Sequence, residues 1–81
     1  MWQIELEFIS GGRDIEDVIV EIMNEYEVGA VVTHSGLTGA YDYRVRLTGT
    51  WQSLADYVMR EYAYDSEEYA HIMGAKLRRT A

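Results

Sequence analysis

The sequence of 81 residues contains no cysteine and no proline. Without cysteine, the chain has no disulfide framework, no thiolate ligands for zinc and no cysteine nucleophile. No apolar segment approaches the roughly 18 residues that a membrane span needs, and no basic stretch followed by an apolar run marks a signal peptide. We therefore expect one cytoplasmic domain over residues 1–81, without membrane association.

Positive charge is also scarce, because seven Lys and Arg residues stand against fourteen Asp and Glu residues and the net charge is −7. Residues 1–27 hold eight of the acids and a single base, Arg13. Such a surface repels phosphate backbones, so we expect no direct binding of nucleic acid. The acids are consistent with a solubilising face, and they leave open the attraction of a basic partner or the mimicry of nucleic acid.

Alternation of apolar and polar residues predicts three strands. The first covers residues 2–8 and is followed by the turn residues Ser10-Gly11-Gly12. The second covers residues 30–35, and a turn over residues 36–39 leads to the third. The apolar positions of the third strand are Tyr41, Tyr43, Val45 and Leu47.

Two helices are predicted from apolar stripes at helical spacing. The first begins after Asp14 as N-cap and ends near Gly29; its apolar residues are Ile15, Val18, Ile19, Ile22, Met23 and Tyr26. The second begins after Thr50 as N-cap, and its expected buried residues are Trp51, Leu54, Ala55, Val58 and Tyr62.

The tail from Tyr69 to Leu77 is compatible with two structures. As a strand it places His71, Met73, Ala75 and Leu77 on one face, whereas as a helix it is capped by Ser66 and keeps apolar residues at helical spacing. We favour the strand and keep the helix as the alternative.

With a final strand the fold class is α+β. The element order βαββαβ then predicts a ferredoxin-like arrangement, a four-stranded antiparallel sheet with two helices on one face. Strands one and three are neighbours in that topology. Their outer face would pair Glu5 and Glu7 with Arg44 and Arg46, and opposite charges across antiparallel strands are favourable.

Residues 38–47, Thr-Gly-Ala-Tyr-Asp-Tyr-Arg-Val-Arg-Leu, resemble the Thr-Gly-x-Tyr-Asp segment of the effector-binding domain of leucine-responsive (Lrp/AsnC) regulators. The resemblance covers nearly the whole chain in the order of its elements. Because the first strand starts at Trp2, we expect a stand-alone effector domain without the helix-turn-helix of full-length members.

The resemblance implies a regulatory, non-catalytic homo-oligomer that pairs through its open sheet faces and binds an amino acid or a similar small ligand. It implies that Thr38, Gly39 and Asp42 line the ligand site. Gly39 would let backbone N–H groups approach a carboxylate, Asp42 would accept from an ammonium group, and Tyr41 would supply an apolar wall. Co-assembly with a full-length regulator is a further expectation, and neither a cofactor nor a metal is implied.

Other residues suggest less specific alternatives. His34 and His71 match no metal-ligand spacing. Tyr57, Tyr64 and Tyr69 fit the core stripes poorly, which favours an interface and self-association. The alternative function is a small acidic inhibitor or nucleic-acid mimic, including one of viral origin, that blocks a nucleic-acid-binding protein. A small ferredoxin-like enzyme would need a pocket between sheet and helices, a space that the apolar stripes fill.

Overall fold

The computed structural model describes residues 1–9, 11–36 and 42–80. Within them the fold is α+β, with four strands and three α-helices, the second of which continues as a π-helix. In chain order the elements are β1 (Trp2–Phe8), α1 (Ile15–Tyr26), β2 (Gly29–Ser35), β3 (Tyr43–Gly49), α2 (Trp51–Tyr57), the π-helix η1 (Val58–Tyr62), α3 (Ser66–Lys76) and β4 (Arg78–Arg79).

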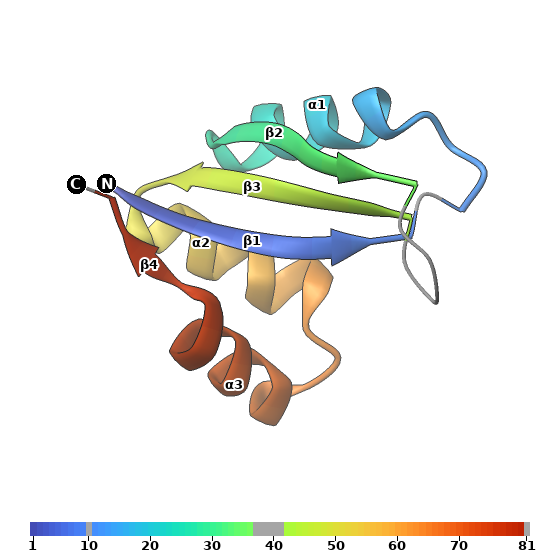
Figure 1. The fold of residues 1–81 in the computed structure, drawn as a ribbon. Coiled ribbons are helices and arrows are strands. Elements are labelled where there is room, and N and C mark those ends of the chain that lie inside the picture. Colours follow the sequence, from blue (N-terminus) through green and yellow to red (C-terminus); the bar gives the residue numbers. More distant parts are fainter. Residues whose placement is uncertain (10, 37–41, 81) are drawn as a thin grey trace.

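The strands form one open antiparallel sheet in the order β2-β3-β1-β4. The predicted pairing of strands one and three is confirmed, because β1 and β3 align over their full length with Glu5 opposite Arg46 and Glu7 opposite Arg44. α1 and α2 lie behind the sheet in Figure 1, so the charged residues of β1 and β3 are on the face that these helices leave open.

The core lies between the sheet and these two helices. Alternate residues of β1 and β3 point into it, and α2 adds Leu54 and η1 adds Val58. The largest fully buried side chains are Ile4, Leu6, Val45, Leu47, Leu54 and Val58, none more than 1% exposed. The space in which a ferredoxin-like enzyme would need a pocket is therefore filled by aliphatic side chains.

Both predicted helix caps are confirmed. The Asp14 carboxylate accepts from the backbone N–H of Glu16 at 2.9 Å, and the Thr50 hydroxyl accepts from that of Ser53 at 3.1 Å. Such contacts satisfy N–H groups that have no partner within the helix. The prediction that the first helix ends near Gly29 is wrong. The residue that follows α1 is Glu27, which takes the left-handed conformation with φ of 56°, and Gly29 is the first residue of β2.

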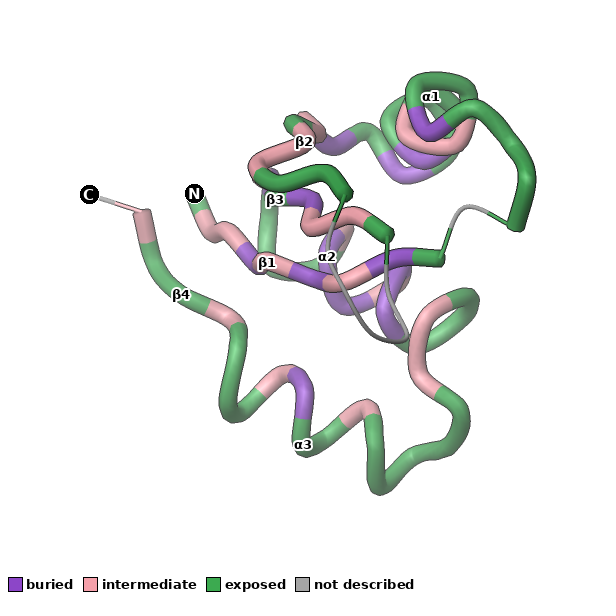
Figure 2. The backbone as a smooth tube through the Cα atoms, turned by 45° about the vertical axis from the view of Figure 1, so that its right-hand side comes forward, coloured by how far each residue is buried: buried purple, intermediate pink, exposed green. Residues whose placement is uncertain are grey.

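The favoured structure of the tail is wrong. Residues Ser66–Lys76 are helical, Asp65 rather than Ser66 is the N-cap, and the final strand is limited to Arg78 and Arg79. Ile72 is the buried residue of α3, and Tyr69 and Met73 pack partly buried against the core. Most of α3 is coloured as exposed in Figure 2. The structure therefore has three α-helices where the sequence predicted two on one face of the sheet. The third, α3, lies below the β1–β4 edge of the sheet in Figure 1.

Two expectations for aromatic residues are also wrong. Tyr57 is only 4% exposed, because its ring contacts those of Phe8, Tyr26 and Tyr62 at centroid distances of 5.3–6.5 Å. Trp51 is 45% exposed rather than buried. Tyr64 is 91% exposed, as expected for a surface residue.

Candidate functional site

Of the residues that the family resemblance implies for the ligand site, only Asp42 falls within the described residues. Thr38, Gly39 and Tyr41 lie outside them. Asp42 is exposed directly before β3, and its backbone N–H donates to the carbonyl of Phe8 at 3.0 Å. This bond holds Asp42 beside the end of β1, at the same end of the sheet as Glu7 and Arg44.

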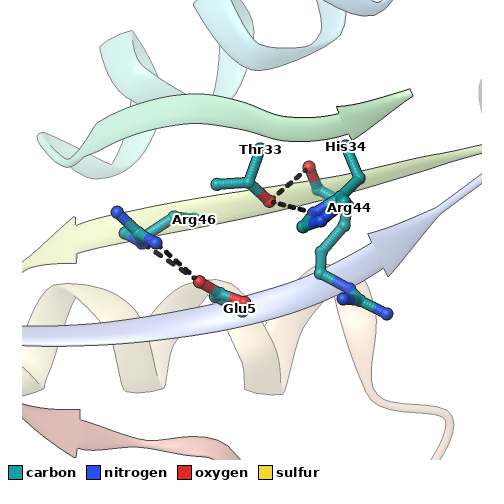
Figure 3. Close-up of polar contacts among 5 residues, drawn as sticks. All are labelled: Glu5, Thr33, His34, Arg44 and Arg46. Carbon is teal, nitrogen blue, oxygen red and sulfur yellow. Dashed lines mark hydrogen bonds and ion pairs between the residues drawn. The ribbon is translucent and has the colours of Figure 1, made fainter.

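The open face of the sheet carries a cross-strand ion pair. The Arg46 guanidinium donates to one carboxylate oxygen of Glu5 through Nε at 3.1 Å and Nη2 at 2.9 Å (Figure 3). The two side chains are 45% and 37% exposed, so water screens their attraction and the pair contributes about 0.2–1 kcal/mol. Its larger effect is to orient both groups across the middle of the face.

The next pair along the same strands is arranged differently. Glu7 and Arg44 are cross-strand partners, yet neither forms an ion pair with another residue that the structure describes. The Arg44 side chain extends from β3 towards β1 (Figure 3). Both groups are half-buried, which leaves a carboxylate and a guanidinium available to a further charged group on this face.

The strand β2, which flanks Arg44 on the side away from β1, contains a bulge. The β2–β3 register shifts between Val32 and His34. The Thr33 hydroxyl donates to the Arg44 carbonyl at 3.2 Å, and it lies 3.2 Å from Nδ1 of His34 (Figure 3). The bulge thus brings a hydroxyl and an imidazole next to Arg44.

A groove of about 310 Å³ lies where this face meets the end of α3. It is lined by side chains of both charges, from β1, β3, α3 and β4: Gln3, Ile4, Glu5, Glu7, Arg44, Ala75, Lys76 and Arg78. Its volume is at the lower end of the range for small-molecule sites. A carboxylate can meet the cations of such a groove while an ammonium group meets its glutamates.

A second, more apolar groove of about 530 Å³ lies between the end of β1 and α3. Its apolar wall is formed by Phe8, Ile9, Tyr57, Tyr62 and Ile72, and its polar residues are Glu7, Glu61, Glu68, His71 and Lys76. Glu7 and Lys76 line both grooves, so the two meet along the outer edge of β1.

Two buried phenols, one of them in the wall of the second groove, keep their protons at neutral pH. Burial raises the pKa of the Tyr57 phenol far above its usual value, with the Glu61 carboxylate adding to the effect. Burial likewise raises the pKa of Tyr26 to about 12, again with a contribution from Glu61. Both phenols therefore stay neutral and act as packing groups.

The two histidines lie on different elements. His34 is in β2 at one side of the sheet, and His71 is in α3 beyond the opposite side. In residues 1–9, 11–36 and 42–80, no group of three or more His, Asp or Glu side chains is placed to hold a metal ion. No helix in these segments is long and apolar enough to cross a membrane.

Sequence reasoning missed Lys76 and Arg78 as lining residues of the first groove. They follow from the helical structure of the tail, which brings the end of α3 and the start of β4 back to β1.

Comparison of the chain with protein-family models, with curated proteins and with solved structures finds no match.

Proposed function

We propose that this chain is a non-catalytic binding domain that pairs with a second copy through its open sheet face and holds an amino acid or similar small zwitterion there. The observation that carries the proposal is the register of β1 and β3. This register places Glu7 directly opposite Arg44. Neither side chain forms an ion pair with another described residue, and both line a groove that contains side chains of both charges. If two copies pair about a twofold axis through this face, Glu7 of each copy can face Arg44 of the other.

In this proposal the fold is a ferredoxin-like variant. The strand order β2-β3-β1-β4 and the antiparallel pairing support that assignment, and α3 is an insertion before a shortened last strand. The resemblance of residues 38–47 to Lrp/AsnC effector domains supports the ligand class and the expected co-assembly with a full-length regulator. Asp42 lies two positions before Arg44, so the segment that carries the resemblance leads into the strand whose Arg44 lines the groove.

The test is thermal unfolding against a panel of the twenty amino acids. A ligand at ~100 times its dissociation constant adds about 2.7 kcal/mol of stability, which raises the melting temperature of a domain this size by about 10–20 °C. The proposal expects the shift to vanish when the ligand's carboxylate is amidated or its amine is acetylated. No shift with any amino acid contradicts the ligand class.

A matched pair of variants locates the site. Arg44→Gln removes one of the two guanidinium groups that line the groove, the one opposite Glu7, and should abolish the thermal shift. Arg60→Gln makes the same change at an exposed residue of η1 that does not line the groove, and should leave the shift intact. An equal loss in both variants would place the ligand elsewhere.

A second candidate, a small acidic inhibitor of a nucleic-acid-binding protein, is favoured by the exposure of α1. All acids from its N-cap to its C-cap are exposed: Asp14, Glu16, Asp17, Glu21, Glu25 and Glu27. Competition with duplex DNA for a lysine-rich histone, measured across salt, distinguishes the two functions. An inhibitor's affinity falls steeply with salt, whereas an enclosed amino-acid site responds weakly.

A further inference from the structure

The few basic side chains of this acidic chain gather at one groove. The sequence has fourteen Asp and Glu residues against seven Lys and Arg residues. Three of those seven, Arg44, Lys76 and Arg78, line the groove of about 310 Å³ on the open sheet face. Among the described residues, two carboxylates line it with them, those of Glu5 and Glu7. The groove therefore carries an excess of positive charge, although the net charge of the chain is −7.

One of the two carboxylates already has a cationic partner outside the groove. Arg46 donates to one oxygen of Glu5 through Nε at 3.1 Å and Nη2 at 2.9 Å, and Arg46 is not among the described residues that line the groove. The ion pair is neutral as a unit. Glu5 therefore offsets little of the positive charge that Arg44, Lys76 and Arg78 bring to the groove.

The other carboxylate is balanced by the residue opposite it. Glu7 and Arg44 are cross-strand partners on β1 and β3, and they supply one charge of each sign. In the proposed dimer they face their counterparts across the twofold axis, or they meet the ammonium group and the α-carboxylate of the ligand. Either arrangement matches one positive charge with one negative charge. A ligand without net charge therefore leaves Lys76 and Arg78 with no acidic partner in the groove.

Lys76 and Arg78 lie on either side of the point where α3 ends and β4 begins. Both are exposed, and neither forms an ion pair with another residue of the described segments. Nη1 of Arg78 donates to the carbonyl of Leu77 at 3.1 Å, which leaves the other N–H groups of this guanidinium for a ligand. The backbone of Arg78 is paired with that of Gln3, so β1 holds Arg78 at the groove.

We propose that the ligand of this groove is an amino acid with an acidic side chain, aspartate or glutamate, and that Lys76 and Arg78 bind its side-chain carboxylate. The inference rests on the proposed function, because it takes amino-acid binding at the open face as given. A guanidinium can donate two parallel hydrogen bonds to one carboxylate, and the lysine ammonium adds a second positive charge beside it. A ligand of net charge −1 reduces the excess of positive charge that a neutral amino acid leaves in place.

The test compares aspartate with asparagine and glutamate with glutamine by isothermal titration calorimetry. Within each pair a carboxylate is replaced by an amide of nearly the same shape, so the comparison isolates the charge of the ligand's side chain. In at least one pair the acid should bind about tenfold more tightly than its amide. Succinate and glutarate keep two carboxylates and lack the amine, so they should bind at least about tenfold more weakly than the preferred acid.

The outcomes separate this inference from the function on which it rests. If a neutral or basic amino acid binds as tightly as the better of the two acids, the acidic ligand is contradicted while amino-acid binding stands. If none of the twenty amino acids binds, both are contradicted. If succinate or glutarate binds as tightly as the acids, the groove is a dicarboxylate site and the inference is overturned.

A matched pair of double variants assigns the preference to its residues. Lys76→Gln combined with Arg78→Gln should reduce the ratio of acid to amide affinity to less than about twofold. Arg60→Gln combined with Arg79→Gln also removes two positive charges, but neither residue lines the groove, and the Arg79 guanidinium lies 5.7 Å from the centre of the Trp2 ring. This control should keep the ratio near tenfold. An unchanged ratio in the first variant, or an equal loss in both, contradicts the assignment.

Discussion

Replacing Tyr62 by phenylalanine removes one hydroxyl and tests how η1 is attached to the edge of β1. The Tyr62 hydroxyl donates to the Glu7 carbonyl at 2.8 Å, between residues 55 positions apart. The ring also packs against Phe8, with centroids 5.6 Å apart. Phenylalanine keeps the ring contact and removes the hydrogen bond to the Glu7 carbonyl.

The expected loss of stability is about 0.5–1.5 kcal/mol, the usual net contribution of one hydrogen bond. For a domain of this size it lowers the melting temperature by about 2–12 °C. Both residues are half-buried, so water can partly replace the hydroxyl and the lower half of that range is expected.

The matched control is Tyr64→Phe, two residues further along the chain. Tyr64 is 91% exposed, so removal of its hydroxyl should change the free energy of unfolding by less than about 0.5 kcal/mol. Urea unfolding of the two variants, followed by far-ultraviolet circular dichroism, measures the difference. If the two variants are equally stable, the Tyr62–Glu7 bond contributes nothing and the reasoning about this edge is refuted.

Three further predictions concern the core, the titration of buried phenols and a helix end. Leu54→Ala should cost about 2–5 kcal/mol in urea unfolding, because Leu54 is fully buried; a cost below about 1 kcal/mol would contradict the described core. The raised pKa values of Tyr26 and Tyr57 mean that the unfolded chain loses these protons near pH 10 while the folded chain keeps them. Stability should therefore fall as pH rises from about 10 towards 12, and ultraviolet titration should show these two phenols ionising after the exposed ones. Glu27→Gly should raise stability by about 0.5–1 kcal/mol, since Glu27 has a φ of 56° that glycine adopts without strain; a melting temperature at or below that of the unaltered protein would contradict this.

The central strands and the starts of the first two helices were predictable because their signals are local and agree with one another. Alternation in residues 2–8 and in the third strand fixes which side chains face the core. Opposite charges at facing positions predicted Glu5 and Glu7 beside Arg44 and Arg46, and the structure has an ion pair between Glu5 and Arg46. Asp14 and Thr50 cap their helices because a side-chain oxygen at that position reaches an N–H group of the first turn that has no partner within the helix.

The tail was not predictable from its own residues. Tyr69 to Leu77 can be arranged with either strand or helix periodicity, and the choice is made by contacts with distant parts of the chain. Ile72 packs into the core, together with side chains of β1, β3 and the second helix. The roles of Lys76 and Arg78 in the first groove depend on that choice, so no local pattern indicated them.

Tyr57 shows a second reason why burial is hard to predict. It lies beside the main apolar stripe of its helix, on the flank that faces α1. Its ring meets that of Tyr26 edge-on at 5.3 Å, a contact between helices that are far apart in the sequence. An aromatic residue on the flank of a stripe is buried only when a second helix lies against it.

The measurement that tests the account most directly is sedimentation equilibrium of the protein and three charge variants of its open sheet face. Pairing through this face predicts that the unaltered protein is a dimer and that Glu7→Arg and Arg44→Glu are each monomers, because each variant sets like charges opposite one another across the twofold axis. The double variant Glu7→Arg with Arg44→Glu should restore the dimer. A monomeric unaltered protein, or single variants that dimerise as well as it does, would contradict pairing through this face.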